Sequence, residues 1–295
     1  FNLHSQYMEF FDIMPMIADF DLQDLGLRTV MPEAQAGITF ADGRPPVILH
    51  RPDLLERTHA NLSRYSKADA DTYVELKQRA AALEPMLAAG LYNPPGDLPA
   101  PDQAMMAEMV FGDMGITGDY AAKSPKVVID ELFETPELRA LLYRATPEWG
   151  FPIDQTGTGT GFLTFIMWTM ANWKLVLGGT HGLAKAMTQA CYREGVDLIE
   201  NTSVDRVLIE DGRAVGVSTR TGDIRATRCV ASNADLRQTM LDMVGPEHLS
   251  ERWVKRSRAF RYGPSHVLGT PMFCLFEAPE YTSARHDPEI NRCFY

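Results

Sequence analysis

The chain has 295 residues, of which 45% are hydrophobic and 23% are charged, and its formal net charge at pH 7 is −11. This composition predicts a folded protein with a sizeable core and excludes a disordered chain. The negative charge argues against a nucleic-acid-binding surface and against electrostatic docking on anionic lipid, because both partners would be repelled. It leaves open a local apolar contact with a membrane.

The four cysteines show none of the spacings that bind metal or form redox pairs. No C-x-x-C pair occurs, and no histidine lies at a zinc-like spacing from Cys191, Cys229, Cys274 or Cys293. They predict reduced thiols with a structural role in a cytoplasmic protein, and a reactive role is the alternative. The first residues do not have the pattern of a signal peptide. Because the sequence starts at Phe1 rather than Met, we expect an excerpt of a longer chain or a processed one.

The first fifty residues combine an apolar start with a predicted hairpin. Residues 1–24 are dense in aromatic side chains and methionines. This favours core or a buried connection, and the wall of an apolar substrate cavity is the alternative. Two short apolar runs, 37–40 and 47–49, flank Asp42 and Gly43. Asp-Gly between two such runs predicts a β-hairpin.

Residues 52–91 predict helices. Pro52 can open the first helix. Ser66 is typical of the N-cap of a second, because its hydroxyl can accept a hydrogen bond from a backbone N–H of the first turn. The second helix has an apolar stripe at helical spacing, formed by Tyr73, Leu76, Ala80 and Leu83. This stripe predicts the face that packs on the core.

A proline-rich loop and a long apolar run mark the middle of the chain. The prolines of residues 93–101 exclude helix and strand there and predict an exposed loop, whereas Pro125 and Pro136 predict helix starts. Residues 162–177 form the most apolar run, which is too short to span a bilayer and contains Lys174. A buried core helix is favoured, and cavity lining or a shallow membrane contact are the alternatives.

The order of turns and apolar runs becomes regular from residue 178 onward. Residues 178–182 predict a tight glycine turn that leads into a helix, and Gly195 predicts the end of that helix. The apolar run at 196–199 predicts a short buried strand. A helix followed by such a strand is half of a β-α-β unit.

Residues 203–231 predict a three-stranded antiparallel meander, with turns at 211–213 and 221–223. Small residues at the end of a strand let a ligand approach the backbone closely. The predicted third strand, 224–231, ends at such a group, formed by Ser232, Asn233, Ala234 and Asp235.

Three sequence motifs in this order carry a resemblance to a known family. Residues 178–183 read GGTHGL, residues 204–217 read VDRVLIEDGRAVGV, and residues 232–235 read SNAD. Together they resemble the phytoene desaturase and carotenoid isomerase family, which belongs to the amine-oxidase-like group of flavoproteins. The resemblance is strong over about residues 178–245, looser over 1–60 and 246–280, and weak between residues 60 and 178.

The resemblance implies FAD, bound without covalent attachment. It implies that the backbone N–H and C=O of Val204 hold the adenine ring, although Val204 is equally typical of an ordinary strand residue. It also implies that Ser232, Asn233 and Ala234 lie beside the cofactor.

The resemblance places the glycine turn near the flavin ring or the substrate channel. The residues concerned are Gly178, Gly179 and Thr180, and the alternative is that the glycines only form a helix entry turn. His181 is the best single candidate for a polar group near the ring, although a histidine at a helix start is more often satisfied by backbone or solvent. No other catalytic residue is assigned.

The resemblance also implies the fold class. We expect an α/β protein with a partial Rossmann-like, glutathione-reductase-like FAD-binding domain and an inserted mixed α+β substrate domain. The dinucleotide fingerprint G-x-G-x-x-G and the C-terminal glycine-rich motif of the family are absent, so either the sequence is an excerpt or the cofactor site is incomplete. Residues 1–24 would be an apolar connecting segment, 25–177 the largely helical substrate domain with some strands, and 178–245 part of the FAD domain. Residues 246–295 would return to the substrate domain, with sheet strands at 266–268 and 272–276.

The predicted function is that of an FAD-dependent desaturase, saturase or dehydrogenase, which transfers hydride to or from the flavin on an apolar, polyene or lipid-like substrate. A redox-neutral flavin-dependent isomerase and a non-catalytic scaffold that has lost the cofactor are the alternatives. No Ser/His/Asp set or H-E-x-x-H pattern stands out, which argues against a hydrolase or a metal site. A peripheral membrane contact remains open, and the electron acceptor and oligomeric state do not follow from the sequence.

Overall fold

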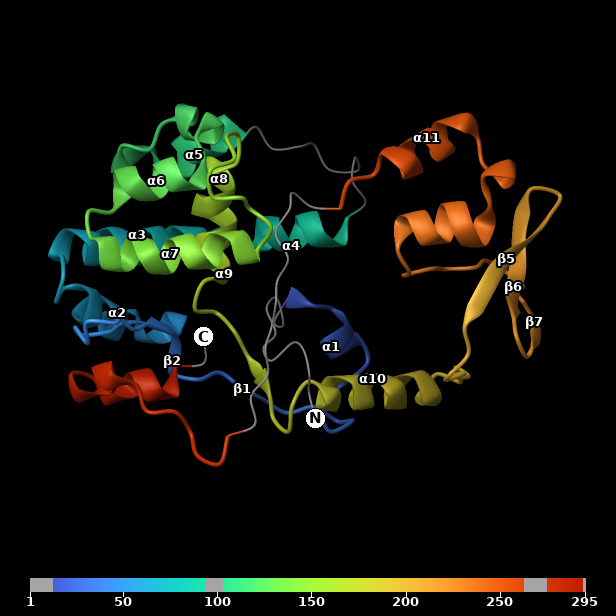
Figure 1. Ribbon diagram of the computed structural model, residues 1–295, viewed down its shortest axis with the longest axis horizontal. Coiled ribbons are helices and arrows are strands. Elements are labelled where there is room, and N and C mark those ends of the chain that lie inside the picture. The colour runs from blue at the N-terminus through green and yellow to red at the C-terminus, as the bar shows by residue number, and fades with distance from the viewer. Residues whose placement is uncertain (1–12, 94–102, 263–274, 294–295) are drawn as a thin grey trace. The chain divides into compact units, whose positions relative to one another are not determined.

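The computed structural model describes residues 13–93, 103–262 and 275–293 (Figure 1). Contacts divide the chain into two compact units. The larger unit comprises Phe1–Ala190 and His266–Tyr295, and the smaller unit comprises Cys191–Ser265. The mixture of helices and strands fits the predicted α/β class.

The larger unit is mostly helical. Its helices are α1 (Met16–Asp19), α2 (Leu55–Leu62), α3 (Lys67–Ala82), α4 (Glu84–Tyr92), α5 (Gln103–Phe111), α6 (Pro125–Leu132), α7 (Pro136–Glu148), α8 (Gly159–Gly161), α9 (Met167–Thr169) and the start of α10 (His181–Arg193). Short 3-10 turns at Pro52–Leu54, Gly112–Met114, Gly118–Ala122, Thr282–Arg285 and Pro288–Arg292 connect or follow them.

The predicted helix starts are confirmed. The Ser66 hydroxyl accepts a hydrogen bond from the backbone N–H of Asp69 at 3.1 Å, as an N-cap does. Pro125 and Pro136 lie in the first turns of α6 and α7. Backbone N–H groups in the first turn have no partner within the helix, so proline, which lacks an N–H, costs no hydrogen bond there.

The main core lies among α2, α3, α5, α6, α7, strands β2 (Ala34–Ile38) and β3 (Val47–His50) and the segment before residue 174. Its largest fully buried side chains include Trp173, Tyr73, Phe111 and Phe133. The apolar run at 162–177 is therefore core, as favoured from the sequence. It is not one helix, however. A π-helical turn at Phe162–Ile166 separates α8 from α9, and the run ends in strand β4 (Leu175–Val176). Threonine hydroxyls that bond to carbonyl oxygens of the preceding turn, such as Thr164 to Thr160 at 2.8 Å, bend helices in this way.

Two small antiparallel sheets belong to the larger unit. Strand β2 (Ala34–Ile38) pairs with β3 (Val47–His50), which confirms the hairpin predicted around Asp42 and Gly43. Gly43 has a φ of +72°, which a residue with a side chain rarely adopts. Strand β1 (Thr29–Val30) pairs with β4, so a segment near residue 30 lies beside one near residue 175.

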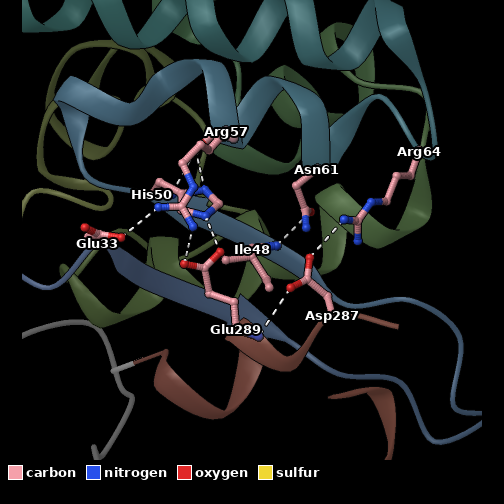
Figure 2. A network of polar contacts seen from close by, with 9 residues as sticks. Glu33, Ile48, His50, Arg57, Asn61, Arg64, Asp287 and Glu289 are labelled. Atoms are coloured by element: carbon pink, nitrogen blue, oxygen red, sulfur yellow. Dashed lines mark hydrogen bonds and ion pairs between the residues drawn. The ribbon is translucent and has the colours of Figure 1, made fainter. Parts of the chain in front are cut away.

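A polar network holds the segment 281–292 on the β2–β3 hairpin and α2 (Figure 2). His50 Nε2 lies 2.9 Å from Glu289 Oε2, and Arg57 donates to Glu289 Oε1 at 2.5 Å and to Glu33 Oε2 at 2.8 Å. Arg64 pairs with Asp287 at 2.9 Å.

The smaller unit contains the predicted meander. Strands β5 (Val204–Glu210), β6 (Arg213–Thr219) and β7 (Gly222–Arg225) form one antiparallel sheet in the order β5-β6-β7. Asp211 and Gly212 turn between β5 and β6 with φ values of +47° and +73°, as a two-residue hairpin requires. A π-helical segment (Gln238–Val244), a short turn (Pro246–His248) and helix α11 (Glu251–Ala259) follow.

Two predictions in this unit are wrong. Residues 196–199 form no strand, and the side chains of Val196, Leu198 and Ile199 are exposed. The third strand ends at Arg225 rather than near residue 231. A strand needs a hydrogen-bonding neighbour, and in the described part of the chain none lies beside 196–199.

Several expectations remain untested by the described residues. Every strand pair within them is antiparallel, so the parallel sheet of a Rossmann-like domain stays a prediction, as do the functional domain limits. Several predicted segments lie outside the described part of the chain: residues 1–12, most of the predicted loop at 93–101, and the strand predicted at 266–268. Of the strand predicted at 272–276, only residues 275 and 276 are described. Among the described helices, none has both the length and the apolar character needed to cross a bilayer.

Candidate functional site

The first group of predicted site residues forms the turn between β4 and α10 in the larger unit. Gly178 and Gly179 have φ values of +80° and +95°, so both need a residue without a side chain. The turn is closed by two backbone hydrogen bonds of 2.9 Å, from Gly179 N to Val176 O and from Gly182 N to Gly179 O. The predicted glycine turn and helix start are therefore confirmed.

Helix α10 is anchored by its apolar face. Leu183, Ala186 and Ala190 pack with Val176 and with the buried residues Leu22 and Leu27 in a second core cluster. A Cβ at Gly182 would lie 3.1 Å from a methyl group of Val176, so the helix start fits tightly on β4. This packing fixes the position of the turn relative to the strand.

The surface of this turn is open. A Cβ built on Gly178 meets no atom within 4 Å, and Gly178 and His181 are exposed, whereas Thr180 is half-buried. The start of a helix carries partial positive charge and favours an anionic or hydrogen-bond-accepting group. The turn can therefore receive a polar or anionic ligand group close to its backbone.

The second group of predicted site residues lies in the smaller unit. Val204 is the first residue of β5 and is paired with Thr219 of β6. Because β5 lies at one edge of the described sheet and β7 at the other, one side of β5 has no neighbouring strand among the described residues. An edge strand presents backbone N–H and C=O groups to a ligand, which is what adenine recognition by Val204 would need.

The SNAD segment forms an ordered and exposed turn. The Ser232 hydroxyl accepts a hydrogen bond from the N–H of Ala234 at 3.2 Å and lies 2.8 Å from the hydroxyl of Thr239. Asn233 and its neighbours are exposed. Small, hydrogen-bonded residues leave room for a ligand beside this turn.

Asp235 organises the end of this turn, a role that the sequence reasoning missed. Its Oδ1 accepts hydrogen bonds from the N–H groups of Arg237 and Gln238 at 2.9 and 3.0 Å and from the hydroxyl of Tyr262 at 2.5 Å. The Tyr262 hydroxyl, followed by the backbone N–H groups, lowers the pKa of Asp235. An aspartate directly before an apolar helical run is the signal that could have revealed this cap.

The structure therefore gathers the predicted residues in two places. Gly178, Gly179, Thr180 and His181 lie together in the larger unit, and Val204 with the 232–234 turn lies in the smaller unit. Within the described residues, no cluster of histidine, cysteine and acidic side chains has the geometry of a metal site.

A hollow of about 340 Å³ opens beside β1 in the larger unit. Met14 and Ile17 contribute apolar walls, while Asp21, Asp24 and Lys174 make part of its lining polar. Residues 13–24 therefore supply both buried core, through Leu22, and the wall of a mixed polar and apolar hollow.

The known proteins that this chain resembles are oxidoreductases. No family model matches the sequence. Along its whole length, the chain is 30% identical to one of the subunits of limonene dehydrogenase from Castellaniella defragrans, and it covers 54% of that protein. Over 77 residues, 26% of this chain and 15% of the relative, it is 34% identical to a neurosporene-forming phytoene desaturase of Cereibacter sphaeroides.

A solved structure shows a similar fold. The crystal structure of an oxidoreductase from Methanosarcina mazei matches 87% of this chain and 53% of its own chain, with a TM-score of 0.51 and 14% sequence identity. The chain thus spans about half the length of this structure and of the relative that it matches from end to end.

Proposed function

Because the chain belongs to the family of phytoene desaturase-like oxidoreductases, we propose that it is part of an FAD-dependent enzyme that oxidises or reduces an apolar, unsaturated hydrocarbon. The observation that carries this proposal is the similarity along the whole chain to a protein named as part of a limonene dehydrogenase. A dehydrogenase acting on an unsaturated hydrocarbon such as limonene must remove hydrogen from carbon, and a flavin can accept that hydrogen as hydride.

FAD, when bound, supplies the site that accepts or returns hydride in such a reaction. The residues of this chain would bind and orient it. The open surface at Gly178 fits a planar ring or its polar edge, because no atom of the described residues lies within 4 Å of a Cβ built there. The edge strand β5 at Val204 and the small residues at 232–234 fit the adenosine part.

The visible spectrum of the full-length protein tests this proposal. We expect a flavin absorption that is released on denaturation. Anaerobic addition of an apolar unsaturated substrate should bleach it if the enzyme is a dehydrogenase, whereas an isomerase would convert its substrate with no lasting change of flavin colour. A protein that stays colourless after reconstitution with FAD would contradict both and favour a scaffold.

The substitution Gly178→Ala tests where the flavin binds. The new methyl group would occupy the open space and strain a backbone with a φ of +80°. We expect the Kd for FAD to rise by about tenfold, equivalent to about 1.4 kcal/mol, as measured by fluorescence titration of the apoprotein.

Gly150→Ala is the matched control for this substitution. Gly150 has a φ of +79°, is exposed and also has no atom within 4 Å of a built Cβ, so its backbone strain is the same. It should leave FAD affinity unchanged. Equal losses of affinity in both variants would mean that strain alone, and not contact with flavin, explains the result.

A further inference from the structure

Helix α11 and the residues that follow it form the most basic segment of the described surface. Residues 251–262 contain one acidic residue, Glu251, and five basic residues: Arg252, Lys255, Arg256, Arg258 and Arg261. All five are exposed, and no carboxylate within the described residues pairs with them. The whole chain has a net charge of −11, so this concentration of cations is local.

Aromatic side chains lie among these cations. Trp253, Phe260 and Tyr262 have exposed fractions of 46%, 45% and 52%. The Arg256 guanidinium lies 6.0 Å from the centre of the Trp253 ring, and Phe260 and Tyr262 pack edge to face. Exposed aromatic rings that gather in one place, rather than singly, mark a surface for interaction with a partner.

The helix also has an apolar side. Ser257 is its buried residue and Val254 is half-buried. A hollow of about 880 Å³ lies beside the helix. Its lining combines apolar, basic and acidic side chains, among them Leu249, Val254, Lys255, Arg258, Glu247 and Glu251. The cations of α11 thus lie next to a recess that is partly apolar and carries both signs of charge.

We propose that α11 and residues 260–262, the α11 surface, bind the surface of a membrane that contains anionic phospholipid. Tryptophan and tyrosine favour the interface between water and lipid, and each exposed lysine or arginine near an anionic membrane contributes about 1 kcal/mol. An acidic protein would also match the cations and the aromatic rings, and the absence of binding to either kind of vesicle would favour it.

The negative charge of the whole chain does not oppose this contact. Salt screens charges beyond about 8 to 10 Å at physiological ionic strength, so the membrane meets the local charge of the α11 surface. The inference extends the proposed function, because an apolar substrate partitions into lipid, but it does not depend on flavin binding.

Flotation of the full-length protein with vesicles tests the proposal. We expect binding to vesicles of equal parts phosphatidylglycerol and phosphatidylcholine, and little binding to phosphatidylcholine alone. Binding should weaken as salt is raised to about 1 M, where the screening length falls to about 3 Å. Trp253 fluorescence should shift to the blue on binding, because Trp168 and Trp173 are buried and Trp149 is half-buried, whereas Trp253 is exposed. The variant Trp253→Phe should lose this shift.

The triple variant Arg252→Gln, Lys255→Gln and Arg256→Gln should weaken binding to the anionic vesicles by on the order of a hundredfold. The matched control Arg213→Gln, Arg220→Gln and Arg228→Gln removes the same charge from exposed positions of the same unit. It should bind as the unaltered protein does. Equal effects of both variants, equal binding to both vesicles, or no binding to either would overturn the proposal.

Discussion

Lys77 shows how the hydrogen bonds and burial of a single side chain depend on residues that are distant in the sequence. It lies fully buried on α3, and its ammonium donates to the carbonyl oxygens of Met167 at 2.9 Å, Trp168 at 2.8 Å and Met170. These carbonyls lie in and just after α9, where helical hydrogen bonds run out. Lysine thus serves as a cap for a helix far away in the sequence.

Burial lowers the pKa of Lys77 to about 7 from a usual value of 10.5. Between these two pH values the unfolded chain keeps a proton that the folded protein has released. The free energy of unfolding should therefore rise with pH in this range, by up to about 1.4 kcal/mol per pH unit. Below pH 7 both states are protonated and this contribution to the slope disappears.

The variant Lys77→Met should flatten this dependence. Urea unfolding followed by circular dichroism at pH 7, 8 and 9 measures it. Lys67→Met, on the same helix but with a side chain that is 76% exposed, should keep the slope of the unaltered protein. If Lys77→Met also keeps that slope, Lys77 stays protonated in the folded state because its three carbonyl partners outweigh burial.

At the scale of elements, the contact between the segment 281–292 and the β2–β3 hairpin joins distant parts of the sequence (Figure 2). Ile290 and Ala284 pack on Ala34 and Ile48, and Glu289 connects His50 with Arg57. Gly37 has no room for a side chain, because a Cβ would lie 2.5 Å from Ile290. Apolar packing and the ion-pair network therefore both hold residues 281–292 on the β2–β3 hairpin.

Glu289→Ala should weaken this contact. His50 is 3% exposed, and the substitution leaves its ring and the Arg57 guanidinium without their shared carboxylate. We expect a loss of about 2 kcal/mol in the free energy of unfolding. Faster hydrogen exchange in residues 281–292 should accompany it.

Asp53→Ala is the matched control, because Asp53 is 65% exposed and pairs with Arg51 at the surface. Such pairs contribute about 1 kcal/mol or less. Exchange in residues 281–292 should not change in this variant. Unchanged exchange in Glu289→Ala would show that apolar packing alone holds the segment.

At the scale of the whole molecule, the chain passes between the two compact units twice, first after residue 190 and again after residue 265. The first passage lies within the described residues. Helix α10 ends at Arg193, and residues 194–203 form neither helix nor strand and are almost all exposed. A protease needs an accessible stretch of backbone on either side of the bond that it cuts.

Limited trypsin digestion should therefore cut first after Arg193. Mass spectrometry of the early fragments identifies the site. Arg193→Gln should remove this cut and delay digestion, whereas Arg79→Gln should not, because Arg79 lies within α3. An early cut within α3 instead would contradict the contact division of the chain.

Much of the local structure could be predicted from the sequence. The cap at Ser66, the proline starts of α6 and α7, the hairpin at Gly43 and the turn of Gly178 depend on backbone geometry within a few residues. The types of the neighbouring residues determine such geometry, so it can be predicted from the sequence. The family motifs could be recognised for the same reason.

The sequence by itself thus determined the individual turns, caps and meander strands, and the family to which they point. Only the tertiary structure decided what depends on distant neighbours: that 196–199 is not a strand, that Lys77 caps another helix, and that Asp235 binds Tyr262. It also placed the predicted cofactor residues in two groups, in different compact units. The physical reason is that a partner's position depends on the packing of the whole chain, whereas turns and caps are satisfied by the next few residues.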